Sequence, residues 1–141
     1  MYSVWDIISM SEIILIISPI YFYIKSHNII HFAALIGLIA TLIATEGIKQ
    51  YILPSWKRPS GAKGCDLLCK SPNDEGRPGM PSGHMAVTAF YGAFYKITSP
   101  FYYIYAILIA LSRYYKRCHS IAQIIGGTVF GASCGYAIHL V

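Results

Sequence analysis

The chain has 141 residues, of which 55% are hydrophobic and only 12% are charged. This charged fraction is about half of that found in soluble domains, which argues against a water-soluble helical bundle. The formal net charge is +5. Without a long basic run or a nucleic-acid motif, this charge indicates contact with anionic lipid headgroups or an anionic substrate, and not with nucleic acid.

Apolar segments, taken in chain order, predict about five membrane helices. A membrane-spanning helix needs about 20 mostly apolar residues, and the first, second and last segments reach or approach this length. The third segment is shorter and rich in Tyr and Phe. The predicted helices span roughly residues 7–24, 29–48, 81–97, 100–115 and 120–141. The sequence thus predicts an all-α integral-membrane bundle that forms one domain.

The first apolar segment lacks a basic start and an obvious small-residue cleavage site. We therefore interpret it as a membrane helix and not as a secretory signal. Glu12 interrupts its apolar pattern. A carboxylate is an expensive group in an apolar helix, and the sequence offers no explanation for this one.

A long polar segment, residues 54–81, separates the second predicted helix from the third. It is rich in Pro, Gly, Lys, Arg and Asp, and loops of this length in compact proteins are usually functional or disordered. Because successive helices alternate in direction across the membrane, the N-terminus, this loop and the connection at 114–119 share one face. Three chemically rich segments, 46–58, 81–84 and 112–123, therefore meet at one surface.

These three segments carry the groups that a phosphate site requires. Arg and Lys bind phosphate oxygens, backbone N–H groups at a helix start bind anions, and histidines act as nucleophile or acid at neutral pH. Taken singly, the cations are also explained by contact with headgroups, and the serine by a helix cap. The candidate residues are Lys49, Arg58, Ser82, Gly83, His84, Arg113 and His119.

Two motifs carry a family resemblance. The run Pro-Ser-Gly-His stands at residues 81–84, and Ser112-Arg113 is followed by five residues and then by His119. In this order, between membrane helices, the motifs resemble those of the phosphatidic acid phosphatase type 2 superfamily, which includes glucose-6-phosphatase and the vanadium haloperoxidases. The resemblance covers about residues 46–127 and implies a phosphoric monoester or diphosphate hydrolase.

The resemblance implies a role for each motif residue. His119 attacks phosphorus and forms a phosphohistidine, while His84 protonates the leaving oxygen and then activates water. Such a site stabilises its transition state electrostatically and needs no metal ion or other cofactor. The phosphate oxygens are bound by Lys49, Arg58, Ser82, Gly83 and Arg113.

The spacing of the first motif departs from the family pattern. Eight residues lie between Lys49 and Arg58, which is more than relatives usually have between this Lys and the Arg-Pro pair. We expect a turn at Pro54 to take up the excess, so that Lys49 still reaches the site. Lys57 is the alternative candidate for the same role.

Position 123 departs from the pattern as well, because Gln stands where many members have Asp four residues after the nucleophile. We expect the carbonyl oxygen of Gln123 to accept the ring N–H of His119 and to orient the imidazole. A Gln here is similar to glucose-6-phosphatase and to dolichyl-diphosphate phosphatases. The latter also carry a Gly-Met-Pro-Ser run like residues 79–82, so the resemblance favours a polyprenyl diphosphate substrate.

The predicted function is therefore the hydrolysis of a lipid phosphate or polyprenyl diphosphate whose tail stays in the bilayer. The alternatives are a phosphatase for phosphatidate or another phospholipid, a vanadate-dependent haloperoxidase, and a non-catalytic lipid-binding relative. The small size and hydrophobicity argue against the haloperoxidase. Many relatives have one more N-terminal helix, which suggests that this chain forms a homo-oligomer.

The membrane side of the site is open to two interpretations. The excess of Lys and Arg on the active face favours the cytoplasm, whereas family members commonly place the site on the luminal or periplasmic side, and we expect the latter. In an oxidising lumen Cys65 and Cys69 of the polar loop are candidates for a disulfide; otherwise they are free thiols. We interpret Cys118 and Cys134 as small packing residues.

Overall fold

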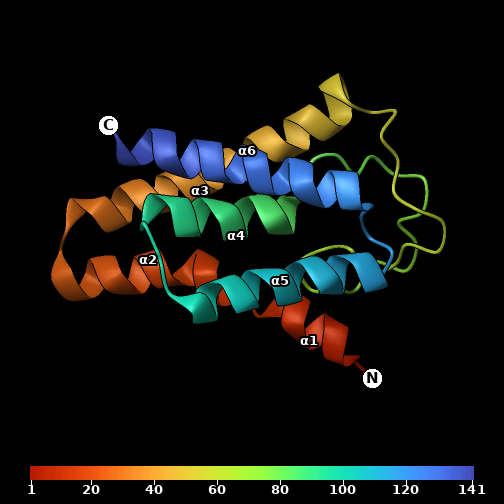
Figure 1. Cartoon of the computed structure of the whole chain (residues 1–141), viewed down its shortest axis with the longest axis horizontal. Helices are drawn as coiled ribbons and strands as arrows, with labels where there is room; N and C mark the ends of the chain where they lie inside the picture. The colour runs from red at the N-terminus through yellow and green to blue at the C-terminus, as the bar shows by residue number, and fades with distance from the viewer.

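Helices are the regular elements of the chain, and the computed structural model describes all residues from 1 to 141. The predicted all-α bundle is confirmed. In Figure 1 most of the helices run along the long axis of the molecule, and the long loop closes one end. The elements are α1 (Val4–Met10), α2 (Ile13–Ser26), α3 (Ile29–Gly47), the π-helical segment η1 (Ile48–Ile52), α4 (Gly83–Phe94), α5 (Pro100–Tyr115) and α6 (Ile121–His139).

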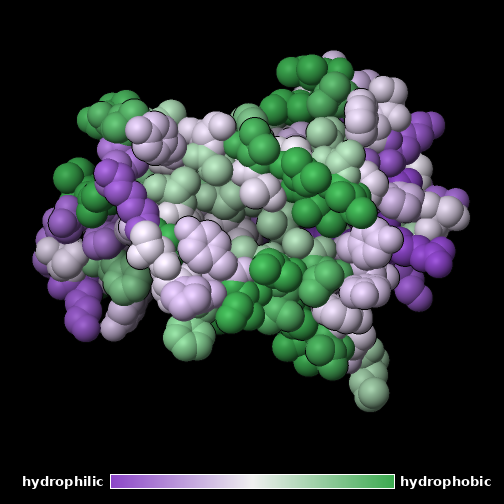
Figure 2. Space-filling model, in the orientation of Figure 1, coloured by the Kyte–Doolittle hydropathy of each residue, from purple (hydrophilic) through white to green (hydrophobic).

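Three segments are long and apolar enough to cross a membrane: Val4–Ser26, Ile29–Ile52 and Ile121–His139. Hydrophilic residues gather at the two ends of the long axis, and hydrophobic residues lie between them (Figure 2). The helices α4 and α5 have 12 and 16 residues, so they are only about 18 and 24 Å long at 1.5 Å per residue. Both are shorter than the hydrocarbon core of about 30 Å. The arrangement suits a multi-pass membrane protein.

The first membrane segment differs from the expected continuous helix at 7–24, because it is broken between α1 and α2. The break contains Ser11 and Glu12, and the hydroxyl of Ser11 donates to the carbonyl of Ile8 (2.6 Å). α1 packs against α5, whereas α2 packs against α3. The break turns Ser9 and Glu12 inward, where both are buried.

A row of glycines holds α6 directly against the backbone of α4. Gly127, Gly131 and Gly135 recur every fourth residue and therefore lie on one face of α6. A Cβ atom at Gly131 would collide with the carbonyl of Ala86, and the other two glycines meet the backbone of α4 or its cap in the same way. This close packing places the start of α4 beside the start of α6 (Figure 1).

The loop between η1 and α4 folds back over the end of the bundle and is fixed there by a disulfide. Cys65 is bonded to Cys118, with a Cα–Cα distance of 5.4 Å, so Cys65 neither pairs with Cys69 nor is a free thiol, the two alternatives that the sequence left open. Cys69 remains a free thiol, and Lys116 Nζ lies 2.9 Å from its sulfur. Cys118 lies 53 residues from Cys65 in the sequence. The interpretation of Cys118 as a small packing residue is therefore wrong.

Candidate active site

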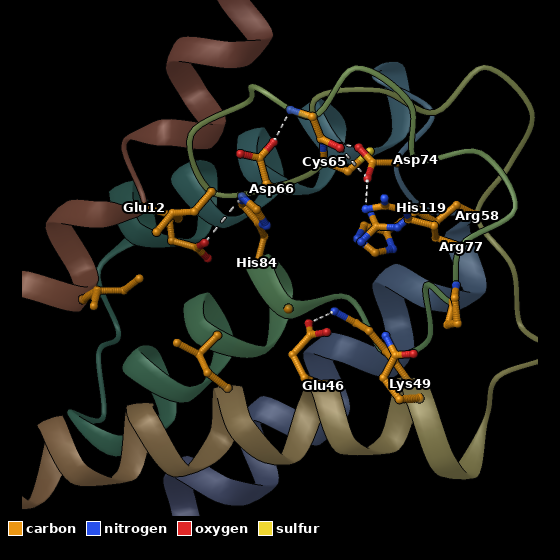
Figure 3. Close-up of a pocket in the computed structure, with 17 residues that line it drawn as sticks. Glu12, Glu46, Lys49, Arg58, Cys65, Asp66, Asp74, Arg77, His84 and His119 are labelled. Carbon is orange, nitrogen blue, oxygen red and sulfur yellow. Dashed lines mark hydrogen bonds and ion pairs between the residues drawn. The ribbon is translucent and has the colours of Figure 1, made fainter.

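A cavity of about 340 Å³ lies at the polar end of the bundle. Figure 3 shows its labelled side chains surrounding one space, with His84 and His119 on different walls. The predicted site residues that line it are Lys49, Arg58, Gly83, His84 and His119. The other three, Ser82, Arg113 and Gln123, are buried and do not line it.

Lys49, and not Lys57, lies at the cavity. Lys49 is only 4% exposed, pairs with Glu46, and its Nζ lies 3.6 Å from the position of a Cβ built on Gly83. Lys57 is exposed on the loop. The chain accommodates the long spacing with the widened turn η1, in which the Leu53 N–H donates to the Ile48 carbonyl (2.8 Å) in the i→i+5 pattern of a π-helix. The extra residues between Lys49 and Arg58 are thus accommodated by η1, before Pro54, and not by the expected turn at Pro54.

Arg58 approaches the cavity from the loop. Its backbone N–H donates to the Arg77 carbonyl (2.8 Å), and its Nη1 lies 3.4 Å from the Cys118 carbonyl oxygen. Gly79 packs against Arg58, because a Cβ there would lie 2.9 Å from the Arg58 Cγ. The absence of a side chain at Gly79 therefore makes room for the aliphatic part of the Arg58 side chain. The sequence did not indicate this role for Gly79.

Arg113 is fully buried on α5, where two contacts fix its guanidinium. Nη1 donates to the hydroxyl of Ser9 (3.0 Å), and Nη2 donates to the carbonyl of Cys65 (2.7 Å). The residue therefore joins α1 and the disulfide-bonded loop to α5. Its Nε has no hydrogen-bond partner in the protein.

The start of α4 presents a serine that does not cap its helix. Ser82 precedes the first helical residue, Gly83, but its side chain makes no capping hydrogen bond, and its buried Oγ has no partner. The backbone is held instead, because the Ser82 N–H donates to the Gln123 carbonyl (3.0 Å). The alternative explanation of Ser82 as only a helix cap is therefore wrong, because its hydroxyl does not cap α4.

His119 lies in the connection between α5 and α6 and is 2% exposed. Its pKa lies well below the ordinary value of 6.5. Burial is the main cause, since it disfavours the charged ring, and the positive charges of Arg113, Arg58 and Lys49 add to it. The ring is thus neutral at pH 7 and keeps a lone pair with which it can attack an electrophile.

Gln123 holds the loop, and the expected hydrogen bond to His119 is not formed. The Gln123 Nε2 donates to the carbonyls of Trp56 (3.1 Å) and Lys57 (2.9 Å), and Oε1 accepts the backbone N–H of Ser120 (3.1 Å). His119 Nδ1 is buried without a hydrogen-bond partner. A weak interaction with Gln123 opposes the lowering of the pKa of His119, but it is the smallest of the causes.

Unpartnered polar atoms concentrate at this site. Six buried side-chain polar atoms in the whole chain lack a hydrogen-bond partner, and five of them belong to the candidate residues. Leaving such an atom unpaired costs about 1–3 kcal/mol, and three of the five belong to residues that line the cavity, Arg58, His84 and His119. This arrangement is typical of a site that binds a polar ligand. The five atoms are Arg58 Nε, Ser82 Oγ, His84 Nε2, Arg113 Nε and His119 Nδ1.

Acidic residues that the sequence did not assign to the site also line the cavity: Glu12, Glu46, Asp66 and Asp74. Most are engaged within the protein. Glu46 pairs with Lys49, Asp66 accepts the backbone N–H groups of Lys70 and Ser71, and Asp74 accepts the backbone N–H of Cys65 (3.0 Å). The contacts of Glu46 and Asp66 are local in the sequence, whereas that of Asp74 with Cys65 depends on how the loop folds back.

Comparison with known proteins agrees with the motifs. A family model described as the PAP2 superfamily matches residues 30–141, which is more than half of the chain and includes every predicted site residue. No curated protein and no solved structure matches the chain. The chain belongs to the PAP2 superfamily, a group of helical membrane proteins whose chemistry is phosphatase or phosphotransferase action on lipid-like phosphates.

Proposed function

We propose that this protein is a membrane-bound, metal-independent phosphatase that hydrolyses a lipid phosphate or polyprenyl diphosphate through a phosphohistidine on His119. The observation that carries the proposal is that two histidines, His84 and His119, line one cavity together with the cations Lys49 and Arg58. Arg58 Nε and His119 Nδ1 are buried there without a hydrogen-bond partner. A phosphoryl group offers several oxygens to such donors and an electrophilic phosphorus to a neutral imidazole.

In the first step a ring nitrogen of His119 attacks phosphorus, and the bond from phosphorus to the leaving oxygen breaks. The leaving oxygen takes a proton from His84. Charge on the other phosphate oxygens is balanced by Lys49 and Arg58, which line the cavity. Positively charged groups in a buried site stabilise this charge more than they would in water.

In the second step water attacks the phosphohistidine, and the bond between phosphorus and His119 breaks. His84, neutral after the first step, accepts the proton of the attacking water. Phosphate leaves, and both histidines return to their starting states. Proton transfer of this kind typically contributes a factor of about 10²–10⁴ to the rate.

A substrate with a lipid tail is supported by the position of the cavity. Ile16 of α2 and Leu42 of α3 belong to its lining, and both lie in segments suited to cross a membrane. A tail can therefore remain in the bilayer while the phosphate enters the polar end. The Gln at position 123 and the Gly-Met-Pro-Ser run at residues 79–82 favour a polyprenyl diphosphate by resemblance.

The disulfide supports a site on the luminal or periplasmic side, because disulfides persist in oxidising compartments. Cys65 lines the cavity, and its partner Cys118 directly precedes His119. A membrane-impermeant maleimide applied to that side of sealed membranes should label Cys69. Labelling from the cytoplasmic side alone would place the site there instead.

The test of the activity is phosphate release in the presence of a chelator, from a panel of polyprenyl diphosphate, phosphatidate, lysolipid phosphate and a soluble sugar phosphate. We expect release from a lipid substrate, and a loss of at least about 10³-fold in His119→Ala. His139→Ala is the matched control, since His139 also has a buried unpartnered Nδ1 but lies at the far end of α6. Binding of these lipids without any phosphate release would favour the non-catalytic relative.

A further inference from the structure

Glu12 is a buried carboxylate beside the proposed active site to which the family match gives no role. It is 2% exposed and lies in the break between α1 and α2, outside the matched residues 30–141. A carboxylate in an apolar segment is costly unless it has a partner. The arrangement around Glu12 identifies that partner.

The two carboxylate oxygens face α4 and meet one face of that helix. Oε1 accepts a hydrogen bond from the Thr88 hydroxyl (3.2 Å), and Oε2 lies 3.7 Å from His84 Nε2. His84 and Thr88 are four residues apart and therefore share a helical face. The Thr88 bond thus orients the carboxylate towards His84, whose Nε2 has no other partner. Figure 3 shows Glu12 and His84 facing each other at one wall of the cavity.

The other charged groups around His84 are mostly positive, and positive charges disfavour a protonated ring. Arg113, Lys116 and Lys49 place positive charges near the ring from α5, the following connection and η1, and the His119 ring is also a neighbour. Glu46 pairs with Lys49, and Asp66 accepts backbone N–H groups. Glu12 is thus the carboxylate whose geometry favours a protonated His84.

We propose that Glu12 is the positioning carboxylate of His84, an inference that rests on the proposed phosphatase function. Glu12 accepts the Nε2 proton of His84 and leaves Nδ1 to serve the substrate. When the bond to the leaving oxygen breaks, the Nδ1 proton moves to that oxygen. The Nδ1 lone pair then takes a proton from the water that attacks the phosphohistidine. Glu12 itself takes up no proton from the substrate or from the attacking water in either step.

This assignment places the carboxylate partner on the acid–base histidine. At the nucleophile the corresponding position is occupied by Gln123, whose amide groups are engaged with the backbone of the loop and of Ser120. A carboxylate beside His84 increases the fraction of protonated rings among the surrounding cations. It also keeps the ring in the orientation required for both proton transfers.

The test is the variant Glu12→Gln, which retains the acceptor for Thr88 but removes the charge. We expect turnover of an alkyl lipid phosphate to fall about 10- to 100-fold. Turnover of 4-nitrophenyl phosphate should fall much less, because its leaving group needs no proton. The alkaline limb of the lipid pH–rate profile should move to lower pH, since His84 then loses its proton more readily. Glu12→Asp, which restores the charge, should recover part of the rate.

The control is Ser18→Ala, which removes a contact between α2 and α4, the 2.8 Å hydrogen bond between Ser18 and Tyr91, away from the cavity. It should leave both the rate and the pH profile as in the wild type. The inference is overturned if Glu12→Gln keeps the wild-type lipid rate, or slows both substrates equally with an unchanged pH profile. A wild-type protein that releases no phosphate from any substrate would instead contradict the proposed function.

Discussion

At the scale of single residues, the proposed mechanism requires a neutral His119 ring for attack on phosphorus. Only the neutral ring has a free lone pair, and burial together with nearby cations favours that form. Because the pKa of His119 is lowered, the protein keeps the reactive form as the pH falls through the ordinary histidine range. Activity is lost only when the pH falls through this lowered pKa.

We predict that the acid limb of kcat/KM lies well below pH 6.5, the ordinary pKa of a histidine. In Arg58→Gln the activity falls and the limb moves towards neutral pH, because the loss of a nearby positive charge raises the pKa of His119. A series of kcat/KM values against pH for both proteins checks this. A wild-type limb above pH 6.5, or a shift to lower pH in Arg58→Gln, contradicts the assignment.

Gln123 stands at a motif position, but its side chain binds the backbone of the loop. Its two amide protons bind the carbonyls of Trp56 and Lys57, next to Arg58 in the chain. We predict that Gln123→Asp lowers the free energy of unfolding by about 2 kcal/mol or more, because it removes both donors and places a carboxylate against two carbonyl oxygens. Thermal unfolding in detergent measures this.

The control for Gln123 is Thr128→Val, which removes only a hydrogen bond within α6, from the hydroxyl to the Ile124 carbonyl (2.9 Å). Its unfolding temperature should change little. An increase in stability or turnover in Gln123→Asp would show that position 123 serves the nucleophile and not the loop.

At the scale of helices, the contact between α4 and α6 positions the start of α4, which carries His84 of the candidate site. Gly131 faces the Ala86 carbonyl without room for a Cβ, whereas nothing lies within 4 Å of a Cβ on Gly47. We predict that Gly131→Ala destabilises the protein by about 1–3 kcal/mol and lowers activity by displacing the start of α4. Gly47→Ala, also helical, should be neutral or stabilising by less than about 1 kcal/mol. Equal unfolding temperatures for the two variants would refute the close contact.

The disulfide fixes the loop next to the proposed nucleophile, since Cys118 precedes His119 and the Cys65 carbonyl binds Arg113. We predict that a reductant lowers activity and reduces stability by about 2–5 kcal/mol. The double variant Cys65→Ser, Cys118→Ser should start at the reduced level and not respond to reductant. A variant lacking Cys69 and Cys134, the two free cysteines, should respond as the wild type does. Reductant-insensitive wild-type activity would contradict this role.

Local pattern was sufficient to predict an all-α apolar bundle and to select Lys49, Arg58, His84 and His119, which line the cavity, because these features depend on near neighbours in the chain. It was insufficient wherever the loop and the first segment fold back. The Cys65–Cys118 pair, the bonds of Gln123 to Trp56 and Lys57, and the contact of Glu12 with α4 all join distant segments. The glycine spacing on α6 was readable in the sequence, but its meaning depended on knowing which helix lies opposite.

At the scale of the whole molecule, hydrophilic ends flank a hydrophobic middle (Figure 2), and the cavity opens at the end that carries the loop. Lys49, Arg58, His84 and His119 come from η1, the loop, α4 and the connection after α5. Four separate parts of the chain therefore converge where a phosphate at the membrane surface can enter while its lipid tail stays in the bilayer.

Covalent catalysis by His119 can be tested by trapping the phosphohistidine intermediate. The wild-type protein is mixed with a ³²P-labelled lipid phosphate or diphosphate, quenched rapidly in alkali, which preserves phosphohistidine, and digested for peptide mapping. We predict acid-labile label on the peptide that contains His119, and none in His119→Ala. Label on His84 or another residue, or wild-type turnover by His119→Ala, would exclude His119 as the nucleophile.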